Sequence, residues 1–503
     1  MTITSFDFLL FLLAGGICYY ILPKSWQWIE LLALSLIFYC LVATPYTLIF
    51  ILISTGTAWV ATNMSLQGRP GILAGAAIFI DVLLWLALKG SSLWVSVSQS
   101  LQRLLPFALE LKPLPIAAAL GMGYYTLQII GYILDCCWGT AKPQKNIVKL
   151  LLFLLFFPQL ITGPISRYNE LEGLYQKHSF SYVGVTRGVQ RILWGFTKKL
   201  VLAERLVGLV DKLWINVGYY RWIALLLFPL QMYADFSGGM DIVIGTAEIF
   251  GIRLSENFKT PFLSRTVQEF WQRWHITLGI WAKDYVLYPF LKSNFIIALG
   301  KKTRKYFGKR VGKMIPTAIG MFVLWMVIGI WHGELRYIAG TCVWYWAILM
   351  MGEICTPFLE KMSNFLHIQR DCFSWRLFQS VRTYIVVAVG TVFFRTDIRE
   401  GFYWILDLRL IFLGENPNIW IFFDGSLAEL AGGRIELYII MLSAALLLIA
   451  AILREKFGSA REWIARQGIV FRWAVWLGLF LFVLIFGMYG PGYDAAEFIY
   501  EGF

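Results

Sequence analysis

The sequence predicts an all-α, polytopic integral membrane protein, and three features of its composition and pattern lead to that prediction. Of the 503 residues, 58% are hydrophobic and only 15% are charged, whereas soluble domains carry about 25% charged residues. Aromatic residues make up 17% of the chain and include 22 Trp, and bilayers enrich Trp and Tyr at their interfaces. The mean hydropathy is +0.65, and apolar runs close to the bilayer-crossing length of about 20 residues recur along the chain.

The apolar runs divide the chain into roughly 11–14 membrane segments. The clear candidates are residues 8–22, 28–43, 46–61, 72–88, 147–165, 222–233, 315–330, 337–351, 384–394, 437–453 and 473–488. Weaker candidates are residues 115–134, 189–210 and 241–250. Several of these runs are short, so some segments are expected to be re-entrant or interfacial. No internal repeat or linker is visible, and residues 1–503 are predicted to form a single transmembrane domain.

The first apolar segment is predicted to be a retained span. Residues 1–20 lack the basic region and small-residue cleavage site of a secretory signal peptide. The seven Cys show no CxxC spacing, and their odd number argues against a disulfide framework. They are interpreted as small apolar residues of membrane helices, and no metal site is expected.

The formal charge of +13 is distributed in short loops between apolar runs, which is the pattern of membrane topology rather than of nucleic-acid binding. Residues 300–313 hold seven basic residues and no acid: Lys301, Lys302, Arg304, Lys305, Lys309, Arg310 and Lys313. This stretch is therefore placed in the cytoplasm. Segment 315–330 then leads away from the cytoplasm and carries Trp331-His332-Gly333 at its far end.

Polar residues gather between Gln231 and Asn257. Ionisable groups inside a membrane protein are costly and are candidates for function. Asp235, Ser237 and the two glycines that follow are expected to break a span, which suggests a cavity lining; helix-packing glycines are the alternative. Gln231 and Tyr233 precede this break, and Asn257 follows it.

Residues 266–285 are predicted to form one amphipathic helix. At a spacing of four, Glu269 pairs with Arg273, Phe270 stacks on Trp274, and Trp271 lies below His275. Tryptophans beside paired charges suit a helix at the interface or one that dips into the protein. An ordinary interfacial anchor explains the same pattern equally well.

Four histidines are present, and two of them lie in membrane-like surroundings. His178 and His367 are in polar loops and are expected to be solvated, whereas His275 and His332 sit among tryptophans next to apolar segments. A neutral imidazole accepts a proton near physiological pH, as a general base must. By position alone, a histidine in such a place is more often a helix-packing donor than a catalyst.

Short motifs ordered along nearly the whole chain resemble the membrane-bound O-acyltransferase (MBOAT) superfamily, and most closely its alginate O-acetyltransferase branch. They are Ser5-Phe-Asp-Phe-Leu, Gly131-Tyr-Ile-Leu-Asp135, Phe156-Phe-Pro-Gln-Leu-Ile-Thr-Gly-Pro164-Ile-Ser-Arg167, Asp235-Phe-Ser-Gly, Glu256-Asn-Phe, Glu269-Phe-Trp-Gln-Arg-Trp-His275, Trp331-His-Gly333, Phe393-Phe-Arg395 and Phe498-Ile-Tyr. Each string is short, and it is their order that makes the resemblance specific.

The resemblance implies an MBOAT-like fold around a central tunnel, with His332 as the catalytic residue deep inside it and His275 as the second important histidine. It also implies a thioester donor from the cytoplasm, either acetyl-CoA or an acyl-carrier thioester, with no bound cofactor. The acceptor would be a polysaccharide or envelope polymer outside a bacterial inner membrane, reached directly or through an extracytoplasmic partner. Substrate-binding or tunnel-lining residues are expected among Gln231, Tyr233, Asp235, Ser237, Asn257, Arg273, Trp274 and Trp331.

The chain departs from the family pattern at two places, which leaves the substrate open. Pro289 is followed by Phe-Leu-Lys-Ser rather than by a Leu-Gly-Gly turn, and Cys137-Trp138-Gly139 replaces a Tyr-Arg-Gly run. D-alanyl transfer to teichoic acid, as in a related branch, is one alternative. A transporter for an envelope glycan precursor and an inactive scaffold that recruits another transferase are the other two.

Overall fold

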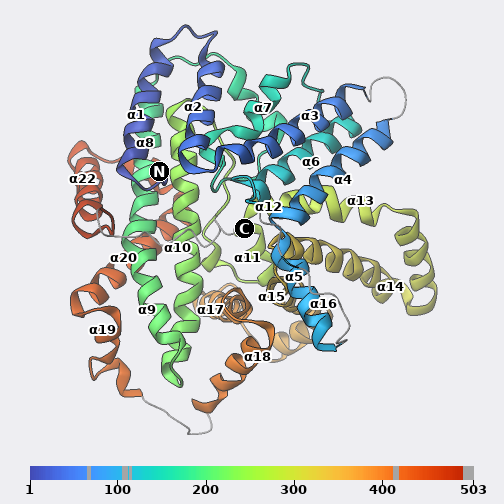
Figure 1. Cartoon of the computed structure of the whole chain (residues 1–503). Helices are drawn as coiled ribbons and strands as arrows, with labels where there is room; N and C mark the ends of the chain where they lie inside the picture. Colours follow the sequence, from blue (N-terminus) through green and yellow to red (C-terminus); the bar gives the residue numbers. More distant parts are fainter. Residues whose placement is uncertain (65–69, 105–111, 113–115, 412–418, 491–503) are drawn as a thin grey trace. The chain divides into compact units, whose positions relative to one another are not determined.

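The computed structural model describes all residues except 65–69, 105–111, 113–115, 412–418 and 491–503 (Figure 1). The Phe498-Ile-Tyr motif therefore lies outside the described residues. The described chain is helical, and its extended pairing is limited to one isolated antiparallel bridge between Phe258 and Trp274. The all-α prediction is confirmed.

The chain forms two compact units, each built from separated stretches of sequence. Unit 1 comprises Met1–Leu88, Pro115–Asn257 and Leu410–Gly502, and unit 2 comprises Lys89–Leu114 and Phe258–Arg409. Each unit is treated separately below. That residues 1–503 act as one domain stays a prediction.

Unit 1 holds the N-terminal and C-terminal helices. Its helices are α1 (Phe6–Ile21), α2 (Gln27–Val42), α3 (Leu48–Met64), α4 (Pro70–Leu88), α6 (Met122–Trp138), α7 (Ile147–Leu155), α8 (Tyr182–Phe196), α9 (Glu204–Trp214), α10 (Tyr219–Ile249), α19 (Ser426–Ala431), α20 (Arg434–Phe457), α21 (Ala460–Ala465) and α22 (Ile469–Phe486). The π-helical turn η5 (Thr197–Ala203) joins α8 to α9. Short 3₁₀ helices lie at Pro45–Thr47, Phe157–Gln159, Tyr168–Tyr175 and Ile419–Phe422.

Unit 2 holds the segments that carry His275 and His332. Its helices are α5 (Ser91–Leu104), α11 (Val267–Arg273), α12 (Ile276–Ala282), α13 (Tyr288–Leu291), α14 (Asn294–Trp331), α15 (Leu335–Tyr337), α16 (Tyr345–Phe365), α17 (Phe373–Thr391) and α18 (Ile398–Asp407). The π-helical turns are η7 (Lys283–Leu287) and η8 (Ile338–Trp344), and the 3₁₀ helices are Pro261–Leu263, η9 (Val392–Phe394) and Leu408–Ile411, which runs on into unit 1.

Seven helices among the described residues are long and apolar enough to cross a bilayer. They are Pro45–Met64, Gly71–Leu88, Asn294–Trp331, Leu335–Phe365, Phe373–Phe394, Arg434–Phe457 and Ile469–Phe486. Three shorter apolar helices are Phe6–Ile21, Gln27–Val42 and Ile147–Gln159. The chain is therefore a multi-pass membrane protein. These seven helices are fewer than the roughly 11–14 membrane segments expected from the sequence. One reason is that the predicted segments 222–233 and 241–250 are parts of one helix.

That helix is α10, and the expected break at Asp235–Gly239 is wrong. Its 31 residues run through the polar block without interruption. The glycines serve close packing instead, since α8 and α10 lie side by side (Figure 1). A Cβ on Gly245 would lie 2.6 Å from the Gly188 carbonyl oxygen, and a Cβ on Gly195 would lie 2.7 Å from that of Gly238. Small residues at such crossings let helix backbones approach in a membrane.

The single helix predicted over residues 266–285 is also wrong. α11 ends at Arg273, and His275 adopts a left-handed conformation with φ of +47° before α12 begins. The break follows from backbone pairing, because the Lys259 amide donates to the Arg273 carbonyl at 2.9 Å next to the Phe258–Trp274 bridge.

Two of the three expected side-chain pairs of this segment are confirmed. Arg273 pairs with Glu269 at 2.8 Å, and the Phe270 and Trp274 rings stack at 5.5 Å. The Trp271 ring packs instead against two rings of neighbouring helices, those of Trp325 and Tyr345.

We predict that Gly245→Ala destabilises unit 1 by about 1–3 kcal/mol, because the added methyl group overpacks the α8–α10 crossing. Gly208→Ala is the matched control, since a Cβ there meets nothing within 4 Å and alanine favours a helix. Thermal unfolding of both purified variants checks this prediction. Equal melting temperatures would contradict the role assigned to the crossing.

Candidate active site

The end of α14 positions His332. Trp331 is the last residue of α14, and the His332 amide still donates to the Ile328 carbonyl at 3.2 Å. Gly333 then turns the chain with φ of +87°, a left-handed conformation that glycine adopts without steric cost. The Ser92 hydroxyl of α5 donates to the Gly333 carbonyl at 2.8 Å and holds this turn. The Trp-His-Gly sequence thus stops the helix and presents the imidazole at its end.

Aromatic rings enclose the His332 imidazole. The side chain is buried, and its ring centroid lies 5.0 Å from that of Trp331, 5.3 Å from that of Tyr337 and 5.8 Å from that of Phe394. Tyr337 and Phe394 also contact each other, at 5.0 Å. The result is an imidazole with largely apolar neighbours that is shielded from bulk water.

His275 also lies beside Trp331. It is also buried, at 3% exposure, and its ring lies 6.2 Å from the Trp331 ring. Trp331 therefore contacts both histidines, which come from segments more than fifty residues apart in the sequence. Unit 2 brings together three of the residues predicted for the site, namely His275, Trp331 and His332.

Burial keeps both imidazoles neutral. It lowers the pKa of His332 from 6.5 to about 3. Burial also lowers the pKa of His275 to about 3, with a further contribution from His332, whose charge would repel a charge on His275. Removal from water disfavours the charged form of a base. At neutral pH each ring is therefore in the form that can accept a proton.

Arg273 and Trp274 support the segment that carries His275. The Arg273 guanidinium donates to the Thr260 hydroxyl at 3.0 Å besides its pair with Glu269. Trp274 is buried and packs edge-on against Phe258 at 5.1 Å. Both side chains hold α11 against the strand-like stretch before it, so the contacts seen here are structural.

The other predicted residues lie in unit 1, and three of them, Tyr233, Asp235 and Ser237, surround two buried lysines on the π-helical turn η5. Lys199 donates to Asp235 at 2.6 Å and pairs with Glu204 at 2.9 Å. Lys198 donates to the Ser237 hydroxyl at 2.8 Å and lies 5.8 Å from the centre of the Tyr233 ring. π-helical turns are rare and occur frequently at functional sites.

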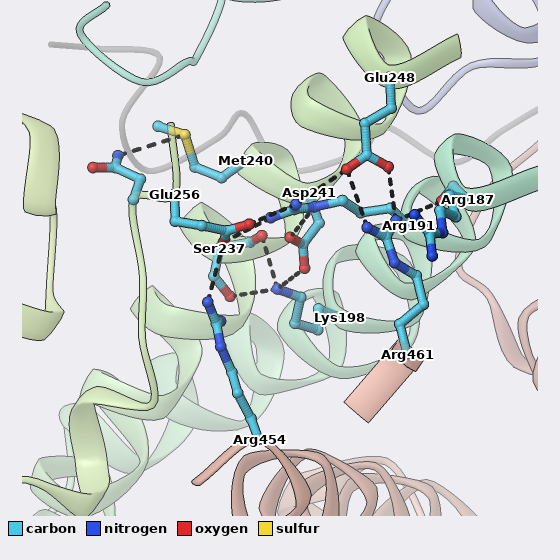
Figure 2. Close-up of polar contacts among 11 residues, drawn as sticks. Arg187, Arg191, Lys198, Ser237, Met240, Asp241, Glu248, Glu256, Arg454 and Arg461 are labelled. Atoms are coloured by element: carbon cyan, nitrogen blue, oxygen red, sulfur yellow. Dashed lines mark hydrogen bonds and ion pairs between the residues drawn. The ribbon is translucent and has the colours of Figure 1, made fainter. Parts of the chain in front are cut away.

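Lys198 extends this cluster into a network of ion pairs that ties α8, α10 and α20 together (Figure 2). It pairs with Asp241 at 2.7 Å, and Arg191 reaches the same carboxylate at 3.0 Å. Arg191 also binds both oxygens of Glu256, at 2.7 and 2.9 Å, and Arg454 of α20 pairs with Glu256 at 3.2 Å.

Gln231 and Asn257 are also buried in unit 1. Gln231 is 3% exposed, and its side-chain oxygen has no hydrogen-bond partner among the described residues. The Asn257 amide donates to the Met240 sulfur at 3.5 Å. No group of three or more His, Cys, Asp or Glu residues in the described part of the chain could hold a metal ion.

Sequence reasoning missed several residues that the structure places beside the predicted ones. They are Arg191, Lys198, Lys199 and Glu204 in unit 1, and Tyr337 and Phe394 in unit 2. A signal for the lysines was available, because two consecutive cations inside the weakly apolar run 189–210 are costly unless they are paired. No comparable signal distinguished Tyr337 from the many other aromatic residues.

Comparison with known proteins finds similarity to membrane acyltransferases. The model of the MBOAT, membrane-bound O-acyltransferase family, matches residues 140–300. A probable alginate O-acetylase of Pseudomonas syringae pv. tomato is 28% identical over 391 residues, which cover 75% of this chain and 69% of the relative. This chain is similar to membrane-bound O-acyltransferases.

Other relatives of this acyltransferase act on different envelope polymers, as their names state. A teichoic acid D-alanyltransferase of Bacillus subtilis is 31% identical over 261 residues, covering 50% of this chain and 62% of the relative. A peptidoglycan O-acetyltransferase of Helicobacter pylori is 25% identical over 342 residues, covering 61% and 57%. These names support an acyltransferase enzyme and leave the acceptor of this one open.

We predict that turnover by this acyltransferase shows no acid limb from the buried imidazoles between pH 8 and about pH 5. Their pKa values lie below the ordinary 6.5, so both rings stay neutral until the pH approaches 3. The unfolded chain, in contrast, takes up protons below about 6.5, so stability falls as the pH drops through that value. A profile of kcat/KM against pH at constant ionic strength checks the predicted turnover. An acid limb near pH 6.5 would contradict that prediction.

We predict that Lys199→Met destabilises the acyltransferase by about 3–5 kcal/mol, because it removes the cation that Asp235 and Glu204 share in a buried site. Adding Asp235→Asn and Glu204→Gln to Lys199→Met is expected to restore part of the loss. The exposed Lys177→Met is the matched control. Thermal unfolding of the purified proteins measures the effect, and a Lys199→Met variant as stable as the control would refute it.

Proposed function

We propose that this acyltransferase moves an acetyl group from a cytoplasmic thioester to a hydroxyl of an extracytoplasmic polysaccharide or other cell-envelope polymer. The donor is acetyl-CoA or an acyl-carrier thioester, and the protein resides in a bacterial inner membrane. Several alginate O-acetylases support the acetyl group and the polysaccharide, since they match about three quarters of this chain. Transfer occurs directly or through an extracytoplasmic acyltransferase or polysaccharide-synthesis partner.

The observation that carries this proposal is the neutral, buried imidazole of His332 at the end of α14. In the proposed reaction His332 removes the proton from the acceptor hydroxyl, and the alcohol oxygen attacks the thioester carbonyl. The carbon–sulfur bond then breaks, and the leaving thiolate takes the proton back from the imidazolium. The products are an ester and a free thiol, and the histidine returns to its neutral form.

His275 is assigned to the oxygen of the tetrahedral intermediate. A neutral imidazole donates one N–H without needing to change its charge, and a donor placed in a dry site stabilises a developing oxyanion strongly. Orienting the donor and relaying a proton are the other roles that a second histidine could take. Both histidine rings lie beside the same aromatic side chain, that of Trp331.

D-alanyl transfer to teichoic acid is the second candidate. The Bacillus subtilis D-alanyltransferase has a higher identity, 31%, than the alginate O-acetylases, although over a shorter stretch. The same two histidines would serve this reaction, because its chemistry is again attack of a hydroxyl on a thioester. Offering the purified protein acetyl and D-alanyl thioesters side by side separates the two, since only the true donor is consumed in the presence of acceptor.

We predict that His332→Ala lowers thioester turnover by about 10²–10⁴-fold, the usual contribution of general base catalysis. The control is His367→Asn, because His367 is exposed and asparagine tolerates its left-handed φ of +49°. Turnover is measured with purified, reconstituted protein as thiol released from the donor.

Equal turnover by wild type and His332→Ala would overturn the proposed mechanism. If acylation in cells also persisted with His332→Ala, a scaffold that recruits another transferase would explain the data. Loss of glycan export without loss of thioester turnover would instead point to transport.

A further inference from the structure

Helix α14 is folded back on itself as a hairpin. Gly308 breaks the helix with φ of +74° and ψ of 178°, and the two limbs pack together on either side of it (Figure 1). The Thr303 hydroxyl of the first limb donates to the Gly312 carbonyl of the second at 2.8 Å. A Cβ on Gly312 would lie only 2.4 Å from the Arg304 Cα, so the limbs touch backbone to backbone.

The charged residues at the tip of this hairpin are all cationic and exposed. All seven Lys and Arg residues of 300–313 have exposed side chains, and the segment contains no acid. Tyr306 and Phe307 stand between these cations at the turn, with 67% and 60% of their surface exposed. The buried residues Gly300, Thr303 and Gly312 lie where the limbs meet.

Both limbs change from apolar to basic at the same level. The first is apolar from Phe295 to Leu299 and becomes basic at Lys301, and the second becomes apolar at Met314, directly after Lys313. A Cβ on Gly300 would lie 3.5 Å from Pro316 of the opposite limb, so the two changes coincide in space. An element that enters the headgroup layer of a bilayer from the hydrocarbon core would show this pattern.

We propose that the α14 tip, residues 301–313, is a binding site for the phosphate groups of anionic phospholipids. Lys and Arg near a membrane surface are attracted to anionic lipids, and exposed aromatic side chains favour the interface between headgroups and acyl chains. An acidic soluble protein would match the charge, but it would not explain the two exposed rings or the apolar limbs directly beneath the cations. Because the second limb ends at Trp331, lipid at the tip also fixes the membrane depth of the helix that carries His332.

The test compares lipids retained by the full-length protein after reconstitution in an equimolar mixture of phosphatidylglycerol and phosphatidylcholine, followed by mild detergent purification. Wild type is expected to retain phosphatidylglycerol in excess. The triple variant K301Q/K302Q/K305Q should bind it at least tenfold more weakly, since each cation near the surface contributes about 1 kcal/mol and 1.4 kcal/mol is tenfold. K301R/K302R/K305R keeps the charge and should retain the enrichment.

The matched control neutralises three exposed lysines of unit 1 in K142Q/K145Q/K177Q and should retain the wild-type enrichment. Equal enrichment in both Gln variants, or no enrichment in wild type, would overturn the proposal. Unchanged lipid retention combined with a raised KM for the thioester donor in K301Q/K302Q/K305Q would assign the tip to the donor or its carrier instead. The lipid measurement needs no turnover, so it stands or falls separately from the proposed acyl transfer.

Discussion

A charged side chain inside a bilayer-embedded protein is costly unless another group of the protein compensates it, and unit 1 is organised by that constraint. Lys198 and Lys199 meet Asp241 and Asp235 across the α8–α10 crossing. Ion pairs of such short length require the helices to be close, and the facing glycines of α8 and α10 allow it. The small residues and the ion pairs therefore depend on one another, because neither contact could form at a larger helix separation.

Unit 2 meets the same constraint at its two histidines by keeping them neutral. His275 and His332 are buried among aromatic rings and remain neutral. A paired carboxylate would favour the imidazolium, whereas apolar burial favours the neutral ring. The arrangement that makes these residues tolerable in a membrane protein thus also keeps both imidazoles unprotonated.

The membrane class, most spans and the place of His332 could be predicted, because hydropathy and the Trp-His-Gly sequence act locally. The prediction of helix boundaries was wrong at two segments, because tertiary contacts decide there whether the helix continues. Residues 235–239 resemble a helix break by composition, yet α10 continues through them because its glycines face another helix. Residues 266–285 have a helical pattern, yet the helix ends at Arg273 because that backbone pairs with the stretch around Lys259.

The sequence by itself determined that this chain is helical and membrane-embedded, since side-chain hydropathy alone sets the cost of leaving the bilayer. It also determined that a histidine follows the last turn of an apolar helix. Only the tertiary structure decided which partners the buried charges take. Lys199 and Asp235 are 36 residues apart, and Arg454 and Glu256 are 198 apart. Electrostatic attraction depends on distance in space, and no local pattern in the sequence encodes that distance.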